Sequence, residues 1–148
     1  GKRTAPSAVN WQEIDIYVTM EAGIYLYDAP CHRLFPVCAG DFRALAIGPG
    51  QAPFGAEAPV RLIYCVEIER LAHTAGYQEP GLQDPEIQKS YYFVDTGLIA
   101  GNVYLFCAAQ GLATWFHNCN KSALATKLKL HADQRVLFGQ TVGYPLKT

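Results

Sequence analysis

The first clear hydrophobic pattern in the chain lies in residues 13–20. Ile14, Ile16 and Val18 stand at every second position, and the positions between them are polar or amphipathic. A period of two with β-branched side chains is typical of a half-buried β-strand. Residues 23–28 have the same strand character, so we expect two consecutive strands at the start of the fold.

The short elements that follow are predicted from turn residues. Only Glu-Ala separates the two strands, and we expect Gly23 to take the positive φ that a tight hairpin turn needs. Residues 34–37 predict a third short extended segment. Residues 41–46 predict one or two helical turns, with Asp41 as the N-terminal cap, that end before a Gly-Pro-Gly sequence.

Residues 60–68 are apolar at nearly every position and follow Pro59. A strand that is apolar on both sides is expected in the centre of a sheet that is covered on both faces. Residues 73–83 are rich in Gly, Pro and Gln and predict a loop.

A long helix is predicted from Asp84 to about residue 110. Asp84 can cap it, a proline occupies the first helical position, an acidic residue lies in the first turn, and Gly111 can end it. Apolar residues recur at helical spacing, namely Ile87, Tyr91, Val94, Leu98 and Leu105. Small residues leave places where another backbone can approach closely, namely Gly97, Ala100, Gly101, Ala108 and Ala109.

A strand at residues 112–116, a helix at 121–130 and a strand at 136–142 complete the pattern. Strands that alternate with helices after an N-terminal hairpin predict an α+β fold, with a mixed sheet flanked by helices and a long central helix. The 148 residues fit a single domain, 1–148, that can bury its own core.

Composition and charge exclude several classes of protein. The net charge is −1 and the Lys and Arg residues are scattered, which argues against nucleic acid as a partner. The apolar residues 91–112 are interrupted by Asp95, Asn102 and Gln110, so we expect no membrane helix. The five cysteines form no CxxC pair, which indicates reduced thiols in a cytoplasmic protein with neither disulfides nor a metal site.

No motif for side-chain catalysis is present. The sequence contains no nucleophile elbow, no HExxH and no Gly-rich phosphate loop after a strand, so we predict no catalytic side chain. His117 is the histidine for which substrate contact and core packing both stay open. Cys107 and Cys119 are expected to fill space in the core.

Three stretches, in this order, resemble the nitroreductase family. Residues 3–12, Arg-Thr-Ala-Pro-Ser-Ala-Val-Asn-Trp-Gln, are similar to the family's Pro-Ser-small-x-Asn-x-Gln loop. Residues 95–114 resemble the family's central helix and the Gly-Leu turn that follows it. A short helix at 124–130 and a strand that ends in Val-Gly-Tyr-Pro at 142–145 are similar to its closing pattern.

The resemblance implies a homodimer that binds FMN at the subunit interface. It implies an oxidoreductase in which electrons pass from NAD(P)H through the flavin to a small-molecule acceptor such as a nitro compound or a quinone. The flavin carries the redox chemistry, and the protein holds its ring with one face open.

The resemblance also implies which residues bind the cofactor. Pro6, Ser7, Ala8 and Asn10 would border the flavin ring of the partner subunit, and Leu112, Ala113 and Thr114 would lie near N5 of the flavin. Lys147 would stand near the FMN phosphate, where a cation complements a dianion. Arg3, in the same loop motif as Pro6, completes the predicted set, and backbone amides near Thr114 or Arg3 are further candidates for the phosphate.

The family's opening helix, with its Arg-Ser-x-Arg type ligands, has no counterpart in this sequence. Two charged hydrogen bonds to the phosphate are together worth about 3–6 kcal/mol, so we expect weak FMN binding by the chain as given. The alternative to the oxidoreductase is a truncated, non-catalytic dimer of the same fold that binds no flavin.

Overall fold

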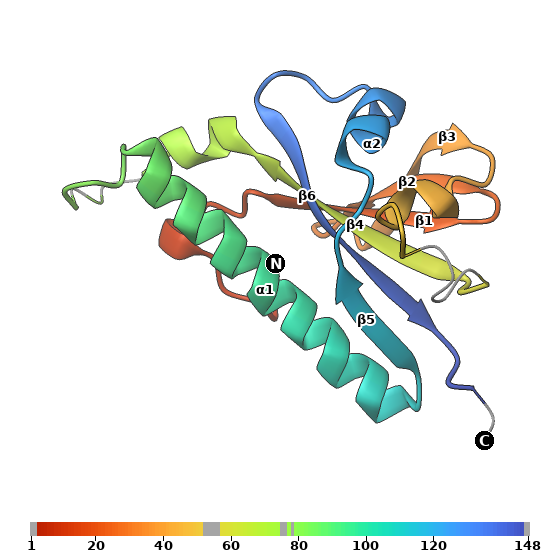
Figure 1. Ribbon diagram of the computed structural model, residues 1–148. Helices are drawn as coiled ribbons and strands as arrows, with labels where there is room; N and C mark the ends of the chain where they lie inside the picture. Colours follow the sequence, from red (N-terminus) through yellow and green to blue (C-terminus); the bar gives the residue numbers. More distant parts are fainter. Residues whose placement is uncertain (1–2, 52–56, 75–76, 78, 147–148) are drawn as a thin grey trace.

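The computed structural model describes residues 3–51, 57–74, 77 and 79–146. Six strands form one sheet in the order β3-β2-β1-β4-β6-β5 (Figure 1). The strands are β1 (Ile14–Met20), β2 (Gly23–Asp28), β3 (Arg33–Ala39), β4 (Val60–Glu67), β5 (Ala113–His117) and β6 (Gln134–Gly143). The helices are α1 (Pro85–Gln110) and α2 (Lys121–Leu128), with 3-10 turns η1 (Ala8–Asn10), η2 (Arg43–Ala46) and η3 (Ile68–Ala72).

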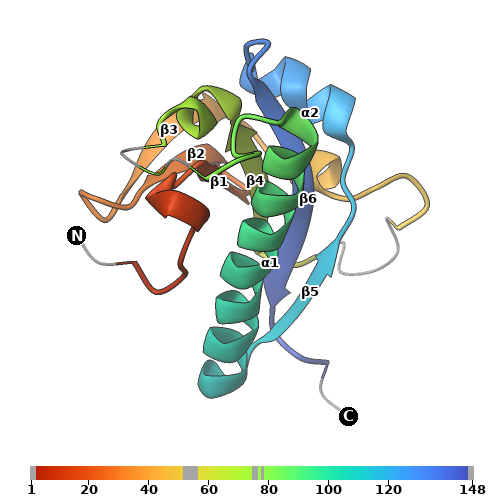
Figure 2. The same cartoon turned by 90° about the vertical axis from the view of Figure 1, so that its left-hand side faces the viewer.

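The two α-helices cover opposite faces of the sheet. Tyr92 and Ala100 of α1 belong to one core cluster, and Leu124 and Leu128 of α2 belong to the other. Figure 2 shows α1 in front of the sheet and α2 behind it. The predicted α+β class, with helices flanking a sheet and one long helix, is confirmed. The sheet was expected to be mixed, whereas all five pairings among the described strands are antiparallel.

β4 lies between β1 and β6 and is the most buried strand of the fold. Ile63, Tyr64 and Val66 expose none of their surface, and the last five residues of the strand are all buried. The prediction of a central strand covered on both faces is therefore confirmed, because a core cluster lies on each side of it.

The hairpin of β1 and β2 is confirmed, but the expected role of Gly23 is wrong. Gly23 pairs with Met20 as the first residue of β2, and it is not among the described residues with positive φ. A Cβ atom at Gly23 would lie 2.5 Å from the carbonyl oxygen of Cys38 on β3. The glycine is therefore needed for the close approach of two strands and not for a turn.

The segment before β4 differs from its prediction in its cap. The N-cap of η2 is Phe42, without a side-chain cap bond, whereas Asp41 was expected there. Asp41 instead accepts a hydrogen bond from the backbone N–H of Arg43 at 3.1 Å and forms an ion pair with the guanidinium of Arg43. The turn η3 lies directly after β4 and was not predicted.

The predicted ends of α1 are confirmed. The Asp84 side chain accepts a hydrogen bond from the backbone N–H of Glu86, and Pro85 occupies the first helical position. At the other end Gly111 has a φ of 67°, and the N–H of Leu112 donates to the carbonyl of Cys107 at 2.8 Å. Both ends thus satisfy backbone groups that a helix leaves without partners.

The apolar residues predicted from spacing in α1 mostly face away from the sheet. The buried residues of the helix are Tyr92, Asp95, Thr96, Ala100 and Cys107. The exposed ones include Ile87, Phe93, Val94, Leu98, Tyr104, Leu105 and Phe106, with Leu105 at 71% and Phe106 at 60%. Phe93 and Tyr104 nevertheless contact Phe138 and Phe116 of the sheet. We call the remaining exposed residues, Ile87, Val94, Leu98, Leu105 and Phe106, the outer face of α1. A sequence that is apolar all round does not by itself indicate which side meets the sheet.

By length and composition alone, α1 passes the test for a membrane span, with a mean hydropathy of 1.3 over its most apolar window. Asp95, Asn102 and Gln110, from which we expected no membrane helix, therefore do not exclude a membrane span on grounds of composition. In the fold, however, α1 packs along β5, β1 and β6, and Asp95 is buried in a contact within the chain.

Replacing Gly23 with alanine should lower the free energy of unfolding by about 1–3 kcal/mol, because the new methyl group collides with a backbone carbonyl. Gly97→Ala is the matched control, since a Cβ there meets nothing within 4 Å and helix propensity should raise stability by up to about 1 kcal/mol. Urea denaturation measures both variants, and equal effects would contradict the close-approach explanation.

Candidate functional site

The loop of residues 4–12 is held in a strained conformation by its own polar side chains. Val9, Asn10 and Gln12 have φ values of 51°, 57° and 52°, a region that non-glycine residues adopt at a cost of about 1–3 kcal/mol each. The Ser7 Oγ accepts from the Gln12 backbone N–H at 3.0 Å, and the Asn10 Oδ1 accepts from the Gln12 Nε2 at 2.8 Å. The Ser, Asn and Gln of this motif thus fix the shape of the loop.

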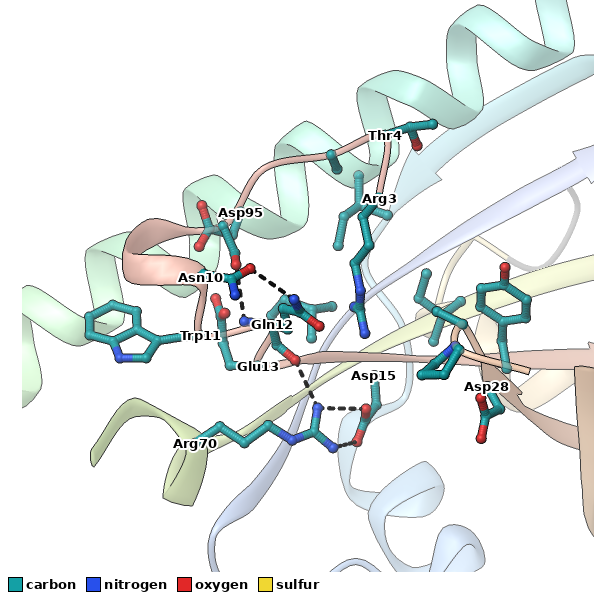
Figure 3. Close-up of a pocket in the computed structure, with 18 of the residues that line it drawn as sticks. Arg3, Thr4, Asn10, Trp11, Gln12, Glu13, Asp15, Asp28, Arg70 and Asp95 are labelled. Carbon is teal, nitrogen blue, oxygen red and sulfur yellow. Dashed lines mark hydrogen bonds and ion pairs between the residues drawn. The ribbon is translucent and has the colours of Figure 1, made fainter. Parts of the chain in front are cut away.

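The loop forms one wall of an open pocket of about 850 Å³. The start of β1, the end of β2 with the hairpin after it, η3 and the middle of α1 provide the other walls (Figure 3). Its charged lining residues are Arg3, Glu13, Asp15, Asp28, Arg70 and Asp95. A pocket of this volume is in the range of sites for drug-sized molecules and cofactors.

Arg70 connects β1 with the loop at the bottom of the pocket. Its guanidinium donates to both Asp15 carboxylate oxygens, at 2.8 and 3.1 Å, and to the carbonyl of Gln12 at 2.9 Å. The side chain of Arg70 is 39% exposed, so the ion pair adds little stability and mainly sets position. Arg3 lies in the same wall and has no ion pair among the described residues.

A pair of buried carboxyl groups lies behind the loop. Glu13 is 0% exposed, and neither of its carboxylate oxygens has a hydrogen-bond partner among the described residues. Asp95 on α1 is 4% exposed, and its Oδ2 accepts from the backbone N–H of Ala8 at 3.0 Å. Burial, together with the neighbouring Asp95, raises the pKa of Glu13 to about 7, although the charge of Arg70 acts in the opposite direction.

The structure gathers one part of the predicted cofactor-binding set. Arg3, Pro6, Ser7 and Asn10 line the pocket, with the side chains of Pro6 and Asn10 exposed. The N–H of Ala8 points the other way and is already bonded to Asp95. Lys147 lies outside the described residues.

The second part of the predicted set lies at the far end of α1. Between Asp95 and Gly111 a helix advances about 24 Å, so Leu112, Ala113 and Thr114 are far from the loop within one chain. Figures 1 and 2 agree on this, since β5 begins where α1 ends, whereas the N-terminal loop lies beside the more N-terminal part of α1. The Thr114 hydroxyl donates to the carbonyl of Thr141 at 2.8 Å.

His117 serves the packing of the sheet. It is 4% exposed, with Nδ1 2.7 Å from the Asn118 carbonyl and Nε2 2.8 Å from the Thr141 hydroxyl. The carbonyl can only accept, so Nδ1 carries the proton and Nε2 accepts from the hydroxyl. Burial lowers the pKa of His117, which keeps the ring neutral. Gly139 lies so close that a Cβ there would come within 2.9 Å of the imidazole.

The cysteines take no part in the pocket. Cys107 and Cys119 are buried as predicted, and burial raises the pKa of both thiols, that of Cys119 to about 11. Both thiols are therefore protonated at neutral pH and poor nucleophiles. Within the described part of the chain, no three His, Cys, Asp or Glu side chains are placed to hold a metal ion.

Sequence reasoning missed the Glu13–Asp95 pair and the Arg70–Asp15 ion pair. The signal for the first was present, because Asp95 interrupts an apolar helix and Glu13 precedes an apolar strand, and buried carboxyl groups need a partner. Nothing local, however, indicates that the two positions meet.

Comparison with known proteins gives a consistent result. A model of the nitroreductase family matches residues 2–144. A protein of Methanocaldococcus jannaschii, provisionally named a nitroreductase, is 30% identical over 121 residues, which cover 77% of this chain and 57% of that protein. A provisionally assigned nitroreductase from Ralstonia eutropha has a similar structure, with a TM-score of 0.80, 28% identity, and coverage of 99% of this chain and 64% of that one.

A more distant structure shares the fold. The NADPH:FMN oxidoreductase from Vibrio harveyi, solved in complex with NAD+, has a TM-score of 0.64 at 21% identity and covers 97% of this chain and 55% of that one. The chain therefore spans between about half and two thirds of the length of these relatives.

The free energy of unfolding should fall by about 2 kcal/mol between about pH 4.5 and pH 7 because of Glu13. In this window the folded chain keeps a proton on Glu13 that the unfolded chain has lost, so rising pH favours unfolding. Glu13→Gln should remove this contribution. Urea denaturation at several pH values measures it, with the exposed Glu21→Gln as the control that keeps the wild-type slope. A Glu13→Gln slope equal to that of the wild type would refute the assignment.

Proposed function

We propose an FMN-dependent oxidoreductase activity for this chain, which belongs to the nitroreductase family. The proposed reaction uses NAD(P)H to reduce a small-molecule acceptor such as a nitro compound or a quinone. The names of the relatives support this reaction class, since one is an NADPH:FMN oxidoreductase solved with NAD+.

The loop that borders the open pocket is the observation that carries the proposal. Pro6, Ser7 and Asn10 line this pocket, and they are among the residues that the family resemblance implies for the flavin ring. Left-handed backbone at Val9 and Asn10 gives the loop its shape, and strained backbone of this kind is concentrated at functional sites.

The residues present fit a flavin mononucleotide. The Asn10 amide and the Ser7 hydroxyl are polar groups suited to a ring edge, and the exposed Pro6 offers an apolar surface. Arg3 is a cation in the same wall and could meet a phosphate. When bound, FMN would supply the electron transfer between nicotinamide and acceptor, and the chain would orient the ring and keep one face accessible.

A homodimer would complete the site. Leu112, Ala113 and Thr114 lie about 24 Å along α1 from the level of Asp95, so one chain alone does not bring both predicted segments to one flavin. The outer face of α1 is apolar and exposed, and such a patch usually marks an interface. A second copy that packs on this face through a two-fold axis could bring its own residues 112–114 to the loop.

We place the protein in the cytoplasm on the state of its cysteines. All five cysteines lie within the described residues and none is in a disulfide, which is the usual state in a reducing compartment. The proposed donor, NAD(P)H, is a soluble cofactor that such a compartment supplies.

Added FMN should bind saturably, and Asn10→Ala should weaken the binding of both FMN and riboflavin by about tenfold, since it removes a hydrogen-bonding group from the ring site. Arg3→Ala should weaken FMN by about fivefold and leave riboflavin unchanged, because an exposed cation meets only the phosphate. Flavin fluorescence quenching measures the four affinities. Glu57→Ala, an exposed residue outside the pocket, is the control.

A folded, colourless protein that takes up neither flavin would overturn this proposal in favour of the non-catalytic dimer. If flavin binds, oxidation of NADH and NADPH with a quinone and with a nitroaromatic acceptor, followed by absorbance, identifies the donor and the class of acceptor.

The double variant Leu105→Glu and Phe106→Glu should dissociate the dimer, with at least a tenfold rise in its dissociation constant, because two charges would be buried in an apolar interface. Both side chains are largely exposed in one chain, so the fold should survive. Leu34→Glu introduces a charge at an exposed apolar residue of β3 and should leave the dimer intact. Light scattering measures all three proteins, and a wild-type monomer at micromolar concentration would contradict the dimer.

A further inference from the structure

We propose that Glu13 and Asp95 are positioning residues, and that Asp95 holds the loop of residues 4–12 against α1 as long as the neighbouring Glu13 keeps its proton. We call this arrangement the carboxyl latch. It extends the proposed function, because the loop that it positions is the one assigned there to the flavin. The latch itself does not require that a flavin be bound.

The two carboxyl groups lie behind the loop and come from different elements of the fold. Asp95 comes from the inner side of α1, and Glu13 stands directly before β1, with the loop leading into it. Figure 3 shows their side chains directed toward one another behind the loop. The Oδ2 of Asp95 accepts from the N–H of Ala8, so the carboxyl group that holds the loop is also the one that an ionised Glu13 would repel.

The surroundings do not provide enough positive charge for both groups to ionise. The ionisable side chains that line the same pocket are Arg3, Asp15, Tyr27, Asp28, Arg70 and Asp95. Arg70 is already paired with Asp15, and its charge only partly offsets the burial of Glu13. Two carboxylates buried side by side repel strongly, so the pair retains one proton near neutral pH.

When Glu13 loses its proton, we expect the loop to move, because α1 and the start of β1 are held more firmly. Asp95 is on a helix of 26 residues with capped ends, and the backbone carbonyl of Glu13 accepts from the N–H of Glu67 at 2.8 Å. The loop instead contains three non-glycine residues with positive φ. Among the described residues, the bond from the Ala8 N–H to Asp95 is the one hydrogen bond between the loop backbone and α1. Repulsion is therefore relieved by movement of the loop away from α1.

The consequence for the site follows from the loop's own hydrogen bonds. Ser7, Asn10 and Gln12 are bonded to one another, so release of Ala8 displaces the groups that line the pocket. Below about pH 7 the latch is closed, and above it the loop loosens. Flavin affinity should then fall by about tenfold between pH 6 and pH 8.

Amide hydrogen exchange in the flavin-free chain tests the latch. After correction for the intrinsic pH dependence of exchange, peptides that cover residues 5–11 should lose at least about tenfold in protection between about pH 6 and pH 8. Peptides from β4 should show no such change. Carbon-13 NMR of the Glu13 side-chain carboxyl carbon, over the same pH range, should show its titration in step with the loss of protection. Protection of the loop that does not depend on pH would overturn the proposal.

Two substitutions should act in opposite directions, which a purely structural role would not produce. Glu13→Gln cannot ionise, so the loop should stay protected at every pH. Asp95→Ala removes the acceptor of the Ala8 N–H, so the loop should exchange fast at every pH. Glu67→Gln, at a buried glutamate on the neighbouring strand whose carboxylate lies 3.3 Å from His131, is the control and should keep the wild-type profile. A Glu13→Gln exchange profile like that of the wild type would refute the latch. If a variant fails to fold, the pH dependence of exchange and the carbon-13 titration of the wild-type chain test the latch instead.

Flavin titration at about pH 6 and pH 8 separates this inference from the proposed function. A pH-dependent loop in a chain that takes up no flavin at either pH supports the latch and overturns only the proposed function. Flavin binding without a pH-dependent loop supports the function and overturns the latch.

Discussion

A single buried carboxylate on α1 connects the N-terminal loop with the rest of the fold. The bond from Ala8 to Asp95 joins positions 87 residues apart and anchors the turn η1 on the inner side of the helix. Without it the described loop would still be held by hydrogen bonds among its own residues, by the packing of Ala8, Val9 and Trp11 on the core, and by the contact of Arg70 with Gln12. The wall of the pocket, and with it the placement of Ser7 and Asn10, depends on this bond.

Polar and apolar side chains are distributed unusually on α1. A helix that is apolar on its outer face and carries an acid on its inner side reverses the common pattern of a surface helix. The acid is tolerated because an amide and a second carboxyl group meet it, and the outer face remains available for contact with another chain. A Cβ at Gly101 would meet nothing within 4 Å in this chain, so a second chain could approach the helix there.

The sequence was sufficient for most of the elements because their signals are local. Alternation gave β1, a continuous apolar run gave β4, and capping residues gave both ends of α1. It was insufficient wherever the cause is a contact between distant positions. Gly23 is needed because β3 approaches it, and no turn rule contains that information. The site was predictable in part for the same reason: the loop motif is local, whereas Glu13 and Asp95 meet only once α1 has packed on β1.

The strained loop and the buried acid pair both cost free energy of folding. Three residues with left-handed backbone and a buried carboxyl group whose oxygens accept no hydrogen bond each cost free energy that a fold selected for stability alone would remove. Replacement of Gln12 by glycine would relieve backbone strain, and replacement of Glu13 by glutamine would remove the titratable group, without deleting a side chain of the core clusters around β4. That both costs occur within five positions, in the wall of the same pocket, indicates that they serve the pocket. A loop that is stable only while its supports are intact responds to what occupies the site, which a loop in its relaxed conformation would not.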